Sequence, residues 1–192
     1  MNRKIISTFL FFFFILIIFY SHAVEQAEWG MCDMSFKTRK RIERWLNDSM
    51  KEAKKAINEG REHNGAKHKL EQCKINEINS LFDKLKFQYD CQCGECGNGG
   101  PSHPNVPGTP FITICQPLDM YLNSSKNDLN QSPKTICGCI QGLIVHELVH
   151  AAGDPTEEGA VDCSKILYPC ATDGYADETP DHKNCKCCEK KG

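Results

Sequence analysis

The sequence predicts an α+β domain that is rich in helix, stapled by disulfides and equipped with a small sheet. A charged stretch with a helical period starts at Phe36, and a short β-branched and aromatic run, "FITIC", occupies residues 111–115 between prolines. All thirteen cysteines follow an apolar N-terminal leader. We therefore expect helices to form most of the core and disulfides to hold the loops, with only one strand evident.

The N-terminal leader has the pattern of a secretory signal peptide. Arg3 and Lys4 precede an almost unbroken apolar run over residues 5–20, and Ala23 ends a cleavage site of small residues. An uncleaved anchor is the alternative, but the run is shorter than the roughly 20 apolar residues that span a bilayer. We therefore expect cleavage after Ala23 and a secreted protein without stable membrane association.

The net charge gives no sign of a nucleic-acid partner. The formal charge is −2 at pH 7, and loss of residues 1–23 removes two cations, Arg3 and Lys4, and no carboxylate, which makes it −4. A mildly acidic chain lacks the basic surplus that binds nucleic acid.

The cysteine count fits an oxidising compartment. A secreted chain pairs its thiols, so thirteen cysteines predict up to six disulfides with one thiol left over. Three Asn-x-Ser sites agree with secretion and predict a glycoprotein; they start at Asn47, Asn123 and Asn130.

Two groups of cysteines could bind zinc instead of forming disulfides. The Cys-x-Cys-x-x-Cys run at residues 91–96 and the Cys-x-Cys pair at residues 137–139 would supply a structural zinc site if their thiols stayed reduced. In a secreted chain we favour disulfides at both places. Cys163 and Cys170 either bond each other or reach the pair at 137–139, because connectivity is not deducible from sequence.

Residues 24–90 are predicted to form a helical scaffold region, or a propeptide. One helix runs from Phe36 to about Glu59, and a second runs from about Lys67 to Gln88. The cysteine-rich region 91–192 follows. It opens with a stretch dense in Gly, Pro and Cys, residues 91–110, which we interpret as an extended loop.

The chemistry of the chain centres on "HELVH", residues 146–150. On a helix, His146 and His150 lie one turn apart on the same face, close enough to share one zinc ion. Glu147 lies about 100° round the helix, where it can reach a water on the metal and serve as general base and then as proton donor to a leaving amine. The alternative is two histidines that share a helix face by accident.

The surroundings of the motif favour a metal. Apolar residues flank it on both sides, so the helix is expected to be buried, and buried imidazoles need partners. The run "GDP", residues 153–155, ends the helix soon after His150 and turns the chain back toward that site.

"HELVHAAG" resembles the active-site helix of the zincin metallopeptidases. The resemblance implies that His146 and His150 bind one zinc ion per chain and that Glu147 activates water. The strand in "FITICQP" is similar to the edge strand that pairs with an extended peptide or protein substrate. The implied fold is a zincin-like domain with a small sheet over the active-site helix, and region 91–192 is then its zinc-binding catalytic region.

The third zinc ligand distinguishes the branches of that superfamily. The chain follows the metzincin pattern as far as Gly153, but Thr156 stands where that branch has His or Asp, and no methionine follows Met120 to form its Met-turn. The glutamate-liganded branch takes its third ligand from a following helix, which "TEEGAVDCSKIL" at residues 156–167 resembles. Thr156 suits the N-cap of such a helix.

Two glutamates compete for the third position. Glu157 shares a face with Ala160 and is preferred, whereas Glu158 is the alternative because it forms a Glu-x-x-x-Asp pair with Asp162, similar to that of thermolysin-like enzymes. Weaker candidates for the metal are Asp154, Asp173 and His182. Candidates for stabilising an oxyanion are Tyr168 and Tyr175, although such tyrosines are more often packed aromatic residues.

The residues thus favour a secreted zinc-dependent endopeptidase that hydrolyses peptide bonds with Glu147 as general base. The alternative is a disulfide-rich secreted binding or toxin-like module in which the motif is degenerate. A third hypothesis is a structural zinc protein with cysteine ligands.

Overall fold

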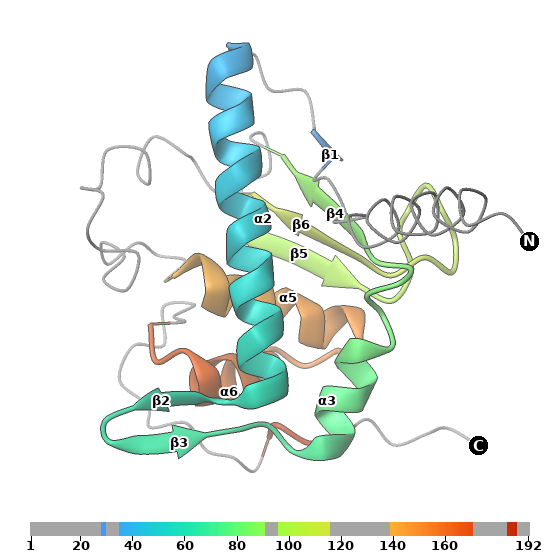
Figure 1. Ribbon diagram of the computed structural model, residues 1–192. Helices are drawn as coiled ribbons and strands as arrows, with labels where there is room; N and C mark the ends of the chain where they lie inside the picture. The colour runs from blue at the N-terminus through green and yellow to red at the C-terminus, as the bar shows by residue number, and fades with distance from the viewer. Residues whose placement is uncertain (1–27, 30–34, 91–95, 116–138, 171–183, 188–192) are drawn as a thin grey trace, which may run out of the picture.

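A computed structural model describes residues 28–29, 35–90, 96–115, 139–170 and 184–187, and these residues form a disulfide-stapled α+β fold (Figure 1). The helices are α2 (Phe36–Glu59), α3 (Gln72–Asn79), α5 (Ile140–Ala151) and α6 (Glu157–Leu167). The strands are β1 (Glu28–Trp29), β2 (Arg61–His63), β3 (Ala66–His68), β4 (Lys86–Tyr89), β5 (Gly97–Gly100) and β6 (Phe111–Ile114). The predicted class is confirmed.

Helix α2 matches its prediction at both ends. Ser35 caps the start, because its Oγ accepts a hydrogen bond from the Thr38 amide at 3.3 Å. Gly60 ends the helix with φ 76°, and its amide donates to the Ala56 carbonyl. Between them, the buried side chains of Ile42, Leu46, Ala53 and Ile57 follow the helical period and face the core.

The prediction of a second helix from Lys67 to Gln88 is wrong, because only the middle of this range is helical and both of its ends lie in strands. Its start lies in a hairpin, β2–β3, whose turn residues Asn64 and Gly65 have positive φ angles of 51° and 74°. Only the short helix α3 follows. The end of the predicted range forms strand β4, in which Phe87 and Tyr89 are buried, and Leu85 just before it continues this alternation. An Asn-Gly turn and a period of two were the signals that a helical interpretation overlooked.

Four strands form the main sheet, in the order β1-β4-β6-β5. Strand β4 runs parallel to β1 and β6, and β5 runs antiparallel to β6, with Gly97 opposite Ile114 and Gly100 opposite Phe111. Strand β5 was expected to be loop, because "GNGG" has no periodicity of its own; its pairing with β6 makes it a strand. The expectation that residues 111–115 form the edge strand is also wrong, because β6 lies between β4 and β5.

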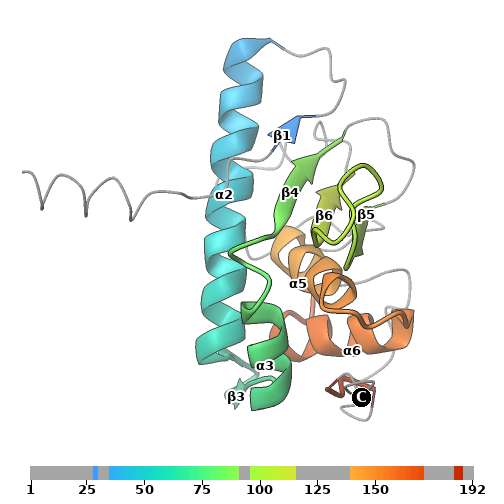
Figure 2. The ribbon, with the colours of Figure 1, turned by 90° about the vertical axis from the view of Figure 1, so that its right-hand side faces the viewer.

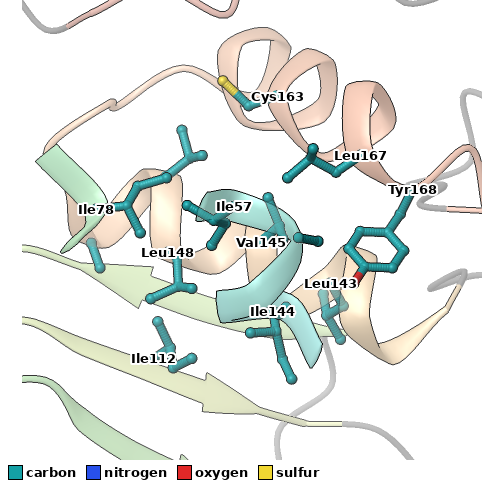
Figure 3. Packing of buried hydrophobic residues seen from close by; sticks show 14 of the residues in the cluster. Ile57, Ile78, Ile112, Leu143, Ile144, Val145, Leu148, Cys163, Leu167 and Tyr168 are labelled. Carbon is teal, nitrogen blue, oxygen red and sulfur yellow. The ribbon is translucent and has the colours of Figure 1, made fainter. Parts of the chain in front are cut away.

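Helix α5 lies beneath the sheet and contacts β5 and β6, while α2 and α6 pack against its other sides (Figures 1 and 2). In the core, Ile57 of α2, Ile112 of β6 and Leu167 of α6 gather around Ile144 and Leu148 of α5 (Figure 3). Residues of region 24–90 and of region 91–192 therefore share one core and one sheet. Region 24–90 is not wholly helical, because β2, β3 and β4 lie in it. The propeptide alternative stays a prediction.

Disulfides join Cys73 to Cys187, Cys139 to Cys170 and Cys163 to Cys185. The predicted alternative of a bond between Cys163 and Cys170 is therefore wrong, and the link from Cys170 to the 137–139 pair is right. Cys96 and Cys115 are disulfide-bonded as well. Because Cys96 and Cys139 are oxidised, they are not thiolate ligands of the zinc site that those cysteine runs would otherwise supply.

Several sequence predictions fall on segments outside the described residues. These are the signal peptide, residues 1–23, and the glycosylation sites at Asn123 and Asn130. The third site, Asn47, lies inside α2 with its Oδ1 buried, and Ser49 of the same site is buried too. Within the described residues, no helix has the length and apolar content to cross a bilayer.

We predict that Ile57→Ala lowers the free energy of unfolding by about 2–5 kcal/mol, because it leaves a cavity where α2 meets α5. Exposed Lys55, two residues away, is the matched control, and Lys55→Ala is expected to change that free energy by less than about 0.5 kcal/mol. Chemical denaturation followed by tryptophan fluorescence measures both. Equal midpoints for the two variants would mean that α2 is not part of the core.

Candidate metal centre

Helix α5 places ionisable side chains inside the fold. Every residue of α5 except His150 is buried, and the exposed fractions of His146 and Glu147 are only 6% and 4%. Burying such groups costs free energy unless polar partners replace water. The structure must therefore supply those partners from the elements that pack against α5.

Glu157 lies directly opposite the two imidazoles. The Nε2 atoms of His146 and His150 are 3.1 Å apart. Oε2 of Glu157 lies 3.2 Å from the first of these nitrogens, and Oε1 lies 3.3 Å from the second. A tetrahedral zinc ion with ligand bonds of about 2.0–2.1 Å has donor atoms about 3.3–3.4 Å apart. Each imidazole is thus about this far from one oxygen of Glu157, and one donor atom from each of the three residues lies within 4.8 Å of the other two, so the three side chains could hold one ion.

The orientation of His150 is set by the turn after α5. Its Nδ1 lies 2.8 Å from the backbone carbonyl oxygen of Asp154. A carbonyl only accepts, so Nδ1 carries the proton. Nε2 then presents its lone pair to the place between His146, His150 and Glu157 where a metal ion would lie. A metal-binding histidine commonly donates its other ring N–H to a carbonyl or carboxylate in this way, which fixes the orientation of the ring.

The same turn starts helix α6 and thereby places Glu157. Gly153 reverses the chain with φ 100°. The Asp154 carboxylate then accepts hydrogen bonds from the Thr156 amide at 3.1 Å and from the Thr156 hydroxyl at 2.7 Å. Thr156 in turn caps α6, because its hydroxyl accepts a hydrogen bond from the Gly159 amide. Glu157 is the first residue of α6, and 72% of its side chain is exposed. The cluster is thus open to solvent on the Glu157 side.

The other acidic candidates lie elsewhere. Glu158 is exposed and does not belong to the donor cluster, whereas its partner Asp162 is buried, and Asp162 Oδ2 makes no hydrogen bond within the described residues. Asp154 contributes its carbonyl to His150 rather than its carboxylate to the cluster. The two remaining predicted metal candidates, Asp173 and His182, lie outside the described residues.

Glu147 faces strand β5 across two glycines. A Cβ atom on Gly97 would lie 2.5 Å from Glu147 Oε1, and one on Gly99 would overlap the Glu147 backbone carbonyl oxygen. At position 99, only glycine therefore lets the backbone of β5 lie directly against that of α5. Sequence reasoning missed this strand, although alternate glycines in a short run are a known sign of close backbone approach.

Tyr168 does not reach the cluster. Its hydroxyl contacts the Glu52 carbonyl at 3.3 Å, and the Arg61 guanidinium lies over its ring. Burial raises the pKa of Tyr168 to about 12. Tyr168 is thus a packed aromatic residue, which was the alternative to a role in stabilising an oxyanion. The other candidate, Tyr175, lies outside the described residues.

A second cluster of ligand types does not offer free thiols. Glu71 lies beside Cys73 and Cys187, but these two cysteines are bonded to each other. Their sulfur atoms are therefore not thiolate ligands.

No family model, curated protein or solved structure matches this chain. The function must therefore be inferred from the geometry of the cluster and from the chemistry of its residues.

We predict that Gly99→Ala lowers the free energy of unfolding by about 1–3 kcal/mol, because the new methyl group collides with the backbone of α5 and forces the sheet away from it. Asn98 is an exposed neighbour in the same strand, and Asn98→Ala is expected to change it by less than about 0.5 kcal/mol. Thermal unfolding followed by circular dichroism measures both. A Gly99→Ala protein as stable as Asn98→Ala would contradict the close packing of β5 on α5.

Proposed function

We propose that this protein is a secreted zinc-dependent endopeptidase of the zincin superfamily, in its glutamate-liganded branch. The observation that carries the proposal is the donor triangle of His146, His150 and Glu157, with Glu147 next to it on the same helix. Secretion is supported by the apolar leader and by the disulfides.

The donor set favours zinc in a catalytic rather than a structural role. Two imidazoles and one carboxylate suit zinc, and catalytic zinc sites have three protein ligands with one position left for water or substrate. Structural sites close all four positions with protein ligands, most often cysteines. Within the described residues the cluster has three protein donors.

In this proposal zinc supplies the Lewis acidity that polarises water and the scissile carbonyl. Glu147 accepts a proton from the attacking water through its buried carboxylate. The water oxygen bonds to the carbonyl carbon, the carbon–nitrogen bond then breaks, and Glu147 returns the proton to the leaving amine. The hydrogen bond to the Asp154 carbonyl orients His150 as a ligand. The backbone of β5 limits where the Glu147 carboxylate can move.

The substrate in this proposal is a peptide in extended conformation. Strand β5 is the last strand of the described sheet and lies against Glu147, so a peptide that adds to it would pass the base. This role falls to β5 rather than to residues 111–115, because β6 is paired on both sides. The acidic net charge gives no support for nucleic acid as a partner.

We predict that the purified protein holds one zinc ion per chain and that His146→Ala abolishes this binding, because two donors no longer enclose the ion. Glu147→Gln should retain the zinc and lose activity by about 10²-fold or more, because the amide cannot accept the proton. Metal analysis and hydrolysis of a denatured protein substrate measure the two properties.

Glu158→Gln is the matched control, since it removes an exposed carboxylate next to the third donor, and we expect unchanged zinc and activity. If Glu147→Gln hydrolysed the substrate at the normal rate, the endopeptidase proposal would be wrong. A protein that keeps its zinc after His146→Ala would instead carry the metal elsewhere. A folded protein with neither zinc nor hydrolytic activity would favour a disulfide-rich binding or toxin-like module.

We predict that Gly97→Ala retains the fold and the zinc but lowers activity about 10- to 100-fold. The three atoms nearest to the added methyl group are Oε1, Cδ and Cγ of Glu147, all in its side chain, so we expect the carboxylate to be displaced rather than the backbone. Asn98→Ala is the control in the same strand. Kinetics with a peptide substrate, alongside metal analysis, would contradict this role for Gly97 if both variants matched the unmodified protein.

A further inference from the structure

Lys74 of α3 is the most completely buried charged side chain among the described residues. Its ammonium group lies 3.2 Å from Glu77 Oε2 and 3.7 Å from Asp154 Oδ2. A buried ammonium group is costly unless acidic groups compensate it. Glu77, one turn along the same helix, provides local compensation, but Asp154 comes from the turn between α5 and α6, on a different part of the chain.

Asp154 connects the second imidazole to the third donor. Its carbonyl oxygen holds His150 Nδ1, and its Oδ1 atom holds Thr156, whose hydroxyl caps the helix that begins with Glu157. The Oδ2 atom, which takes no part in these bonds, faces Lys74. Asp154 therefore bonds to His150 through its backbone and to the start of the helix that carries Glu157 through its side chain.

Gly159 also lies against the same carboxylate. A Cβ atom at Gly159 would lie 2.6 Å from Asp154 Oδ2 and 2.7 Å from the Thr156 hydroxyl. The carboxylate is thus held between a helix terminus and an ammonium group. The helix terminus and the cation both favour a negative charge at this place.

Disulfides connect both α3 and α6 to residues 185–187. Residue 187 is bonded to Cys73, next to Lys74, and residue 185 is bonded to Cys163 in the middle of α6. Residues 185–187 therefore link α3 to α6. This link limits how far Lys74 can move from the turn that it holds.

We propose that Lys74 is a positioning residue of the metal centre: its buried ammonium group holds the Asp154 carboxylate, and through Asp154 it aligns His150 and Glu157 for the metal. This inference rests on the proposed function, because it assigns support to the same site. Lys74 itself touches neither the donor atoms nor the substrate.

The test is zinc affinity of the full folded protein, with Lys74→Met as the variant. We expect its dissociation constant for Zn²⁺, measured by competition with a chelating dye, to rise about 10- to 100-fold, as is usual when a group that orients the metal ligands is lost. Lys74→Arg keeps the charge and should recover most of the affinity. Lys84→Met replaces an exposed lysine and should leave the affinity unchanged.

Asp154→Asn provides a second variant should Lys74→Met fail to fold. The amide oxygen still accepts from Thr156 and the backbone carbonyl still holds His150, so only the charge pairing with Lys74 is lost. We expect weaker zinc binding here too, and a double variant that is little weaker than either single variant, because both remove the same interaction. The absorption spectrum of the Co²⁺-loaded protein should change in both variants, since it reports the ligand geometry.

The outcomes separate this inference from the proposed function. Zinc bound through His146 in the unmodified protein, with weaker binding and an altered Co²⁺ spectrum in the Lys74 and Asp154 variants, supports both. If those variants were less stable but kept the same zinc affinity and Co²⁺ spectrum, Lys74 would be merely structural, and the proposed function would stand. If the unmodified protein bound no zinc through His146, both would be overturned.

Discussion

The burial of α5 is the constraint on which the rest of the structure depends. This helix has the sequence of an apolar core element, yet it carries His146 and Glu147 into the interior. Each polar group on it must meet a partner that replaces water. The sheet, α6 and the turn between the helices provide these partners, so the arrangement of neighbours around α5 follows from the need to accommodate its polar side chains.

The two sides of α5 meet this constraint in different ways. On the sheet side, the partner is β5, a strand of three glycines and Asn98, and the glycine at position 99 allows its backbone to lie against the Glu147 backbone. On the other side, a short turn carries a chain of hydrogen bonds from His150 through Asp154 to Thr156. One side therefore confines Glu147, and the other orients His150 and starts the helix that carries Glu157.

Local signals in the sequence were sufficient to predict an element whose bounds are set by its own residues. Helix α2 has a cap, a period and a terminal glycine, and it was predicted with its observed bounds. Strand β4 was missed because its alternation spans only a few residues, and β5 was missed because it has no period and exists through its pairing with β6. The fold class was therefore predictable, but the order of strands was not.

The sequence by itself determined the spacing of His146 and His150, the place of Glu147 beside them and the capped helix that begins at residue 157, because each follows from the geometry of one or two consecutive elements. Only the tertiary structure decided which glutamate meets the imidazoles, which strand lies over Glu147 and that a lysine of α3 reaches the intervening turn. These contacts join residues far apart in the chain, and they depend on how packed elements are rotated and paired rather than on local periodicity.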